Sequence, residues 1–178
     1  RRQRQMCIRD RIGSSTGFKD LDTKLQGVQK GDLIVVAGRP SMGKTSFAMN
    51  IAENVLLDDD SAGAVLIFSL EMPGESLTTR MLSGMCKLDQ QNVRSGMLKD
   101  DELRILLQQS EKLKNLPLWF DDSSILSPME LRAKARRLAR TEENGLSLIV
   151  VDYLQLMQLP LSTENRAVSY THLRAHET

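Results

Sequence analysis

Apolar residues along the chain follow two alternating patterns. Continuous apolar runs, the candidates for buried strands, occupy residues 33–37, 64–70, 116–120 and 146–151. The stretches between these runs carry apolar residues at helical spacing instead. Continuously apolar strands that alternate with helices are typical of a mostly parallel sheet covered by helices on both faces. We therefore predict one α/β unit over residues 31–155, preceded by a turn region over residues 15–30.

Four segments have the spacing of amphipathic helices. They contain residues 47–55, 81–88, 103–113 and 131–138. The last segment has the clearest start, because Ser127, Pro128 and Glu130 supply an N-cap serine, a proline at the first helical position and a glutamate at the third. We expect this helix to run to about Glu143, with Gly145 just past its end.

Composition narrows the class of protein. The 178 residues include 24 Lys plus Arg, 23 Asp plus Glu and 40% hydrophobic residues, which suits one domain of ordinary size. No apolar run approaches the roughly 18 residues that cross a bilayer, so no membrane partner is expected. Two cysteines, Cys7 and Cys86, are too few for a disulfide framework and lack the spacing of a zinc site.

Both ends of the chain resemble translated arms of a sequencing-library adapter. These are residues 1–11 (RRQRQMCIRDR) and 168–178 (VSYTHLRAHET), and we expect the authentic protein to occupy residues 12–167. A basic N-terminal arm and a polar tail are the alternative. Residues 1–11 carry five Arg and one Asp, a net charge of +4, whereas residues 168–178 carry one Arg and one Glu, a net charge of zero. Without both ends the net charge of the chain falls from +1 to −3. Both histidines, His172 and His176, lie in the second end, and neither is a candidate metal ligand or base.

A phosphate-binding motif, G-x-x-x-x-G-K-[ST], is predicted to lie between the strand at 32–37 and the following helix. Its candidate nucleotide-binding residues are Gly38, Arg39, Pro40, Ser41, Met42, Gly43, Lys44, Thr45 and Ser46. The glycines allow a tight backbone turn whose N–H groups point at an anion, and the helix start adds a positive dipole end. Lys44 can reach the phosphate oxygens, and the Thr45 hydroxyl is a hard ligand suited to Mg²⁺. A chance match in a glycine-rich turn is the alternative.

Asp152 ends the apolar run at 146–151. A carboxylate in this position is the usual Mg²⁺-orienting partner of a phosphate loop in nucleotide hydrolases. The alternative is a carboxylate that only caps a turn.

The water-activating group must come from another strand end, since Asp152 is followed by Tyr153 and not by glutamate. Glu71 directly follows the run at 64–70, and the carboxyl ends of parallel strands meet at one edge of a sheet. We therefore expect Glu71 to be catalytic together with Lys44, with a turn or cap role as the alternative. Asp121 and Asp122 reach the same edge, but we interpret them as turn formers.

Several further sequence motifs resemble those of a known protein family. Thr16-Gly17-Phe18 with Leu21-Asp22 resembles the entry to RecA-like ring ATPases. The strings GRPSMGKT at 38–45, SLEMP at 69–73, FDDSS at 120–124 and VDYLQLM at 151–157 resemble replicative DNA helicases of the DnaB type. The resemblance covers residues 12–167. It implies a RecA-like P-loop core, and it assigns Lys44 and Thr45 to phosphate and Mg²⁺, Glu71 to water activation and Asp152 to Mg²⁺.

The resemblance also implies an activity. Members of this family form hexameric rings that encircle single-stranded DNA, move 5′ to 3′ with ATP hydrolysis, and act with a primase and a helicase loader. A cytoplasmic protein of bacterial or phage origin follows. In such proteins the γ-phosphate sensor, the arginine finger and the DNA-contacting loops come later in the polypeptide. We therefore expect a core that is incomplete at the C-terminus, and weak nucleotide binding at best with negligible hydrolysis from the isolated segment.

Two other classes remain as alternatives. A recombination or repair ATPase of the RecA or RadA kind shares the phosphate loop but should lack SLEM and DYLQLM. A nucleotide-regulated switch of the circadian-clock kind should carry a second phosphate loop, and none is present. One basic cluster is interpreted mainly as a solvated helix face that pairs with nearby acids such as Glu143, with contact to DNA as the alternative; it consists of Arg132, Lys134, Arg136, Arg137 and Arg140.

Overall fold

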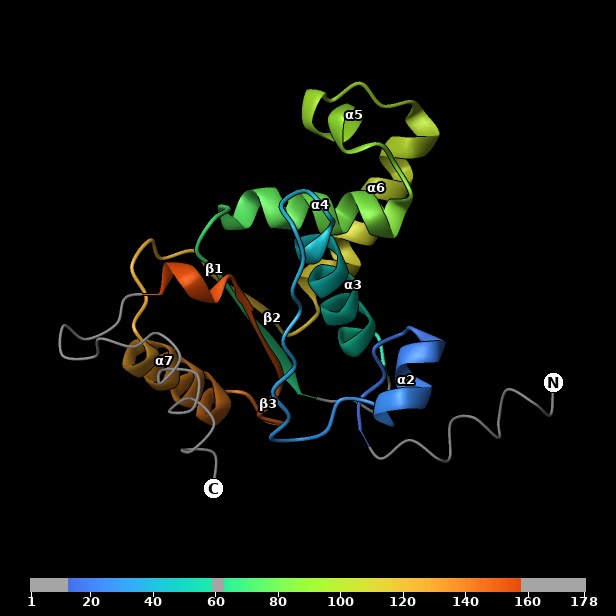
Figure 1. The fold of residues 1–178 in the computed structure, drawn as a ribbon. Helices are drawn as coiled ribbons and strands as arrows, with labels where there is room; N and C mark the ends of the chain where they lie inside the picture. Colours follow the sequence, from blue (N-terminus) through green and yellow to red (C-terminus); the bar gives the residue numbers. More distant parts are fainter. Residues whose placement is uncertain (1–12, 59–62, 158–178) are drawn as a thin grey trace, which may run out of the picture.

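Three parallel strands form the sheet at the centre of the computed structural model, which describes residues 13–58 and 63–157 (Figure 1). The strands are β1 (Ala64–Ser69), β2 (Leu118–Asp121) and β3 (Leu146–Asp152), in the order β2-β1-β3. In register, Phe68 of β1 lies between Asp121 and Val151, and Ser69 lies beside Asp152. The carboxyl ends of all three strands therefore meet at one edge of the sheet, as predicted.

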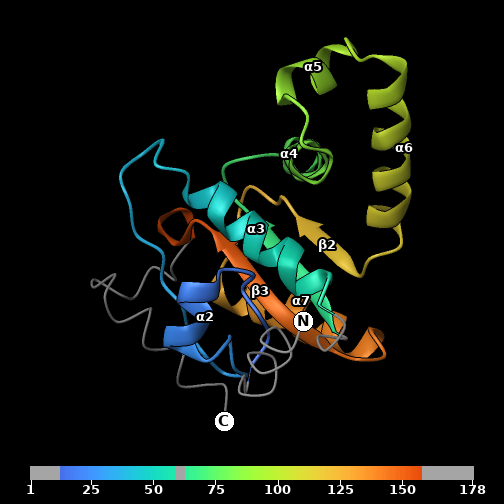
Figure 2. The same ribbon diagram turned by 90° about the vertical axis from the view of Figure 1, so that its right-hand side faces the viewer.

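Helices cover both faces of this sheet (Figures 1 and 2). The described helices are α2 (Lys19–Leu25), α3 (Lys44–Leu56), α4 (Gly74–Cys86), α5 (Gln90–Ser95), α6 (Asp100–Lys114), α7 (Pro128–Thr141) and the short 3₁₀ turn η1 (Leu154–Leu156). Helices α3 and α4 lie on one face, and α7 lies on the other. The predicted class, a mostly parallel α/β sheet with helices on both sides, is confirmed.

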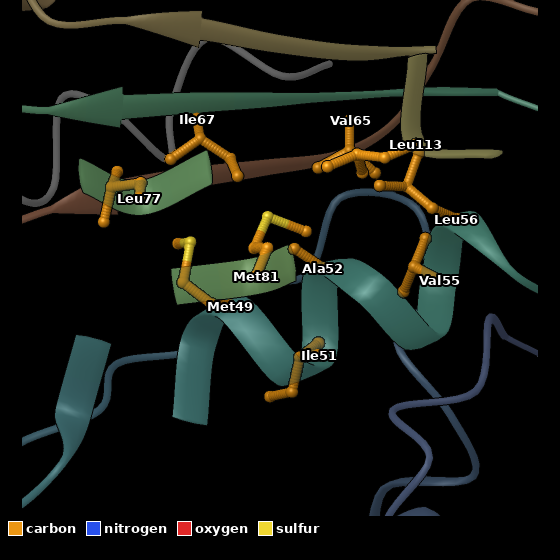
Figure 3. Close-up of a cluster of buried hydrophobic side chains, with 10 residues drawn as sticks. All are labelled: Met49, Ile51, Ala52, Val55, Leu56, Val65, Ile67, Leu77, Met81 and Leu113. Carbon is orange, nitrogen blue, oxygen red and sulfur yellow. The ribbon is translucent and has the colours of Figure 1, made fainter. Parts of the chain in front are cut away.

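Strand β1 is buried along its whole length because it is the central strand and both of its faces are covered. Val65 and Ile67 point to a cluster built from α3, α4 and the end of α6 (Figure 3). Leu66 and Phe68 point the other way, to a smaller cluster that includes Leu131 of α7. The alternation of the strand thus divides one continuous apolar run between two cores.

The prediction of a strand at residues 32–37 is wrong. In the described part of the chain no strand pairs with this segment, and the side chains of Leu33, Ile34, Val35 and Val36 are 42–66% exposed. The run leads as a loop into the phosphate loop, and Figure 2 shows it away from the strand arrows. A strand exists only where a neighbouring strand accepts its backbone hydrogen bonds, and an apolar run does not specify that neighbour.

Helix α7 begins as its sequence predicts. Ser127 is the N-cap, and its hydroxyl accepts a hydrogen bond from the backbone N–H of Glu130, whose carboxylate accepts one in return from the N–H of Ser127. The helix ends at Thr141, two residues before the predicted Glu143, because Glu142 is already extended. Helices α2 and α5 were not predicted, since segments of seven and six residues are too short to show an amphipathic stripe.

The turn region before α3 is held by Asp22, which is 7% exposed. Its carboxylate accepts hydrogen bonds from the hydroxyls of Ser15 and Thr16 and from the N–H of Thr16. Asn54 of α3 donates to the carbonyl of Thr16, and a side chain on Gly17 would collide with that asparagine, since an added Cβ would lie 2.0 Å from its Nδ2 atom. These motif residues therefore fasten the turn region to α3.

Candidate functional site

The phosphate loop folds around the side chain of Lys44. The ammonium donates to the carbonyl of Gly38 at 2.8 Å and to that of Arg39 at 3.4 Å. Gly43 has φ +83°, a backbone conformation that side chains disfavour, and it is the N-cap of α3. Lys44 is thus held across the loop at the point where α3 begins.

The start of α3 is open to a ligand. The loop residues 38–43 are exposed to solvent, and no acidic residue lies in the first turn of the helix. The N–H groups of Lys44, Thr45 and Ser46 belong to this first turn, where a helix supplies no backbone acceptor. Amide dipoles and one ammonium therefore converge on the same exposed loop, an arrangement suited to phosphate.

Thr45 and Asp152 are in direct contact. The Thr45 hydroxyl donates to Oδ2 of Asp152 at 2.7 Å, and Asp152, the last residue of β3, is 8% exposed. A hydroxyl and a carboxylate are the hard oxygen ligands that Mg²⁺ prefers. With Mg–O bonds of 2.0–2.1 Å, adjacent ligands of an octahedron lie about 2.9 Å apart, which is close to the separation observed here. The two residues thus fit the metal that the sequence motif implies.

Glu71 lies two residues beyond the end of β1, at the same sheet edge. Strand β1 is aligned there with β3 through the N–H of Leu70, which donates to the carbonyl of Asp152 at 2.8 Å. The Glu71 side chain is exposed, and among residues 13–58 and 63–157 its carboxylate has no hydrogen-bond or ion-pair partner. It is therefore accessible to solvent beside the strand that carries Asp152.

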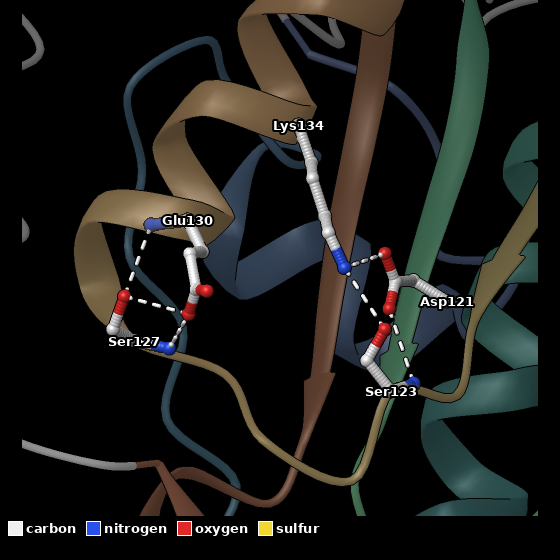
Figure 4. A network of polar contacts seen from close by, with 5 residues as sticks. All are labelled: Asp121, Ser123, Ser127, Glu130 and Lys134. Carbon is white, nitrogen blue, oxygen red and sulfur yellow. Dashed lines mark hydrogen bonds and ion pairs between the residues drawn. The ribbon is translucent and has the colours of Figure 1, made fainter.

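The rival carboxylates at this edge have other partners. Oδ2 of Asp121 lies 2.6 Å from the ammonium of Lys134 on α7, and that lysine also donates to the hydroxyl of Ser123 (Figure 4). Asp122 accepts a hydrogen bond from the N–H of Gly74, the first residue of α4. Both aspartates thus tie the end of β2 to neighbouring helices, and Asp121 also accepts a hydrogen bond from the N–H of Ser123, two residues further on, as a turn-forming aspartate does.

These contacts also set the acidity of Asp121. Burial by itself would raise the pKa of its carboxyl, but the hydrogen bonds from Lys134 and Ser123 and the charge of Lys134 outweigh burial and lower the pKa. A carboxylate made more acidic is a weaker base. Spacing along the chain does not reveal this ion pair, because Lys134 and Asp121 belong to different elements and only the packing of α7 beside β2 brings them together.

Other site types are not seen in the described residues. Within residues 13–58 and 63–157, no three His, Cys, Asp or Glu side chains are grouped so as to hold a metal ion. None of the helices described is both long enough and apolar enough to span a membrane. Cys86 is a buried free thiol, while Cys7, His172 and His176 lie outside the described residues.

Two solved structures share this fold. The ATPase domain of G40P matches with a TM-score of 0.82 at 24% identity, covering 92% of this chain and 57% of that one. A structure described as a DnaB-like replicative helicase and its interactions with primase matches with a TM-score of 0.81 at 24% identity, covering 92% and 39%. The fold and the loop place the chain in the class of P-loop domains with a RecA-like sheet. The model of the DnaB-like helicase C-terminal domain family matches residues 13–174, and the chain belongs to this family.

Similar proteins of known name support the same family assignment. The chain is 47% identical over 162 residues to the replicative DNA helicase DnaB of Buchnera aphidicola subsp. Acyrthosiphon pisum (strain APS), covering 90% of this chain and 35% of that protein. It is 48% identical over 163 residues to the protein of the same name from Pasteurella multocida (strain Pm70), covering 90% and 34%. The chain thus spans about a third of the length of these relatives. No observation favours the recombination or repair alternative.

Proposed function

We propose that this chain binds Mg²⁺-ATP at its phosphate loop and is the ATPase segment of a replicative DNA helicase. The observation that supports this most strongly is the 2.7 Å contact between Thr45 and Asp152. It joins the phosphate loop to a strand-end carboxylate, the pair of groups that an Mg²⁺-nucleotide site requires. The family match and the 47% identity to a DnaB protein support the same conclusion.

Each side chain then has a defined task. Residues 38–46 hold the phosphates through backbone N–H groups, and Lys44 supplies positive charge beside them. Bound Mg²⁺, held by Thr45 and Asp152, would neutralise phosphate charge. Glu71 accepts a proton from the attacking water and orients it, as positioning and charge stabilisation supply most of the catalysis in phosphoryl transfer.

The activity of the whole protein is proposed from the relatives. Replicative DNA helicases named DnaB match most of this chain, and one matching structure includes interactions with primase. We infer single-stranded DNA as the track, movement 5′ to 3′, a homohexameric ring, a primase and a loader as partners, and a cytoplasmic location where bacterial DNA is replicated. ATP hydrolysed between neighbouring subunits would drive the movement.

Nucleotide binding by this chain tests the proposal first. A fluorescent ATP analogue with Mg²⁺ should bind the unaltered protein, and Lys44→Ala should weaken binding at least about 10-fold, because a charge-assisted contact contributes roughly 1.5–3 kcal/mol. Lys24→Ala on α2 is the matched control and should leave affinity unchanged. Equal binding by Lys44→Ala and the unaltered chain would show that the loop is not the site.

Turnover tests the catalytic assignment. In a full-length helicase carrying this segment, Glu71→Gln should retain ATP binding and lose hydrolysis by at least about 100-fold, since the amide cannot accept the proton from water. Phosphate release and analogue binding are measured on the same preparation. Turnover near the unaltered rate would refute the role of Glu71 without affecting the binding site itself.

A further inference from the structure

Ser69 occupies a buried position between two of the site residues. It is the last residue of β1, its exposed fraction is 2%, and its register partner on β3 is Asp152. A hydroxyl at the end of an otherwise apolar strand is costly to bury unless it is fully hydrogen-bonded. We therefore expect the Ser69 hydroxyl to make specific hydrogen bonds.

The hydroxyl of Ser69 closes the turn that carries Glu71. It donates to the carbonyl of Met72 at 2.6 Å and accepts from the N–H of Met72 at 3.2 Å. Both backbone groups of Met72 are thereby tied to the end of β1. Glu71 lies within this four-residue turn, one position before the anchored residue.

The other side of the turn is anchored as well. The N–H of Leu70 donates to the carbonyl of Asp152 at 2.8 Å, which holds the residue before Glu71 against β3. After the turn, Pro73 is the N-cap of α4, and the N–H of Gly74 is bonded to Asp122. The backbone on each side of Glu71 is thus fixed relative to the strand that carries Asp152, while the glutamate side chain itself is exposed.

We propose that Ser69 is a positioning residue for hydrolysis, and that it acts by holding Glu71 in place through Met72. This inference rests on the proposed role of Glu71. Ser69 is buried and its hydroxyl contacts Met72, so it does not touch the nucleotide itself. It would affect hydrolysis through the position of Glu71 relative to the attacking water. A misplacement of a catalytic group by about 1 Å can reduce the rate about 100-fold, so one buried hydroxyl has a measurable effect.

The test compares Ser69→Ala with Glu71→Gln in a full-length helicase carrying this segment. Ser69→Ala removes the hydroxyl without adding volume and should lower single-turnover hydrolysis about 10- to 100-fold. Binding of the fluorescent ATP analogue should stay within about twofold, since the phosphate loop is unaltered. In the Glu71→Gln background, Ser69→Ala should cause no further loss, because a residue that acts only through Glu71 has no effect once that carboxylate is gone.

Ser83→Ala is the matched control. Ser83 is also a buried serine (5% exposed), and its hydroxyl donates to a backbone carbonyl, that of Thr79, within α4. This variant should lose comparable stability and retain hydrolysis. The inference is overturned if Ser69→Ala retains full hydrolysis, if it slows hydrolysis equally in the unaltered and Glu71→Gln proteins, or if it weakens nucleotide binding as strongly as Lys44→Ala. Failure of the proposed function appears separately, as unchanged binding in Lys44→Ala.

Discussion

The hydroxyl of Thr45 donates a 2.7 Å hydrogen bond to the carboxylate of Asp152, although 107 positions separate the two residues in the chain. One residue lies in the first turn of α3 and the other ends β3. The contact brings the start of the phosphate-loop helix to the carboxyl edge of the sheet. Because the same two oxygens suit Mg²⁺, the proposed nucleotide site would depend on this contact of the fold.

Replacing Thr45 by valine should remove the Mg²⁺-dependent part of nucleotide binding. The substitution keeps the branched shape and removes the hydroxyl, one of the two hard oxygens at the site. In EDTA, we expect Thr45→Val and the unaltered protein to bind the ATP analogue with nearly the same affinity. The increase in affinity that Mg²⁺ causes should be smaller in Thr45→Val by a factor of about 10 or more. Thr79→Val on α4 is the control, since the Thr79 hydroxyl donates to the carbonyl of Glu75 within its own helix. An unchanged response to Mg²⁺ in Thr45→Val would contradict the metal assignment.

The ion pair between Asp121 and Lys134 should stabilise the fold in a pH-dependent way. Burial raises the pKa of Asp121, but the hydrogen bonds and charge of Lys134 and Ser123 lower it further than burial raises it, so the folded-state pKa lies below the ordinary value near 3.9. A carboxyl with a depressed pKa contributes stability that is present above its unfolded-state pKa and is lost as the pH falls through the folded-state value. We expect a coupling of about 0.5–1 kcal/mol near pH 7 that declines below about pH 4.

Urea unfolding of Asp121→Asn, Lys134→Met and the double variant at several pH values measures this coupling. Glu130 on the same helix also has a lowered pKa, mainly because of the backbone N–H of Ser127, and the charges of Lys134 and Asp121 act on it as well, so its titration contributes to the measured coupling. A coupling that stayed constant down to pH 3, or that grew as the pH fell, would show that the pair does not act as the structure indicates.

Ser127→Ala should destabilise α7. The serine is the N-cap and takes part in a reciprocal pair of hydrogen bonds with Glu130, so removal of its hydroxyl leaves the N–H of Glu130 without that partner. The expected loss in free energy of unfolding is about 1 kcal/mol. Exposed Ser124, in the same loop, is the control position, and its replacement by alanine should have an effect within about 0.5 kcal/mol. Equal effects at both positions would argue against the cap.

Leu77→Ala should cause a much larger loss. Leu77 on α4 is fully buried in the cluster that covers one face of the sheet (Figure 3). Truncating a buried leucine costs about 2–5 kcal/mol, because transfer energy is lost and a cavity remains. Leu107 on α6 is 61% exposed, and its replacement by alanine should change stability by less than about 1 kcal/mol. Thermal or urea unfolding compares the two variants, and similar losses would contradict the core assignment.

Local patterns predicted much of this fold. The apolar runs identified β1, β2 and β3, and the serine, proline and glutamate at 127–130 identified the start of α7. The run at 33–37 looked the same as the others and yet forms no strand. The difference lies in hydrogen-bonded neighbours, which are decided by the packing of distant segments and leave no mark within the run itself.

The sequence by itself determined the phosphate-loop motif, the strand-end Asp152 and the order of the three strands with helices α3, α4, α6 and α7, because these depend on spacing over a few residues. Only the tertiary structure decided that Thr45 meets Asp152, that Asp121 is engaged by Lys134, and that Ser69 supports the turn of Glu71. Hydrogen bonds and ion pairs act over a few ångströms. Which side chains come that close is set by the register of β1 on β3 and by the packing of α3 and α7 on opposite faces of the sheet.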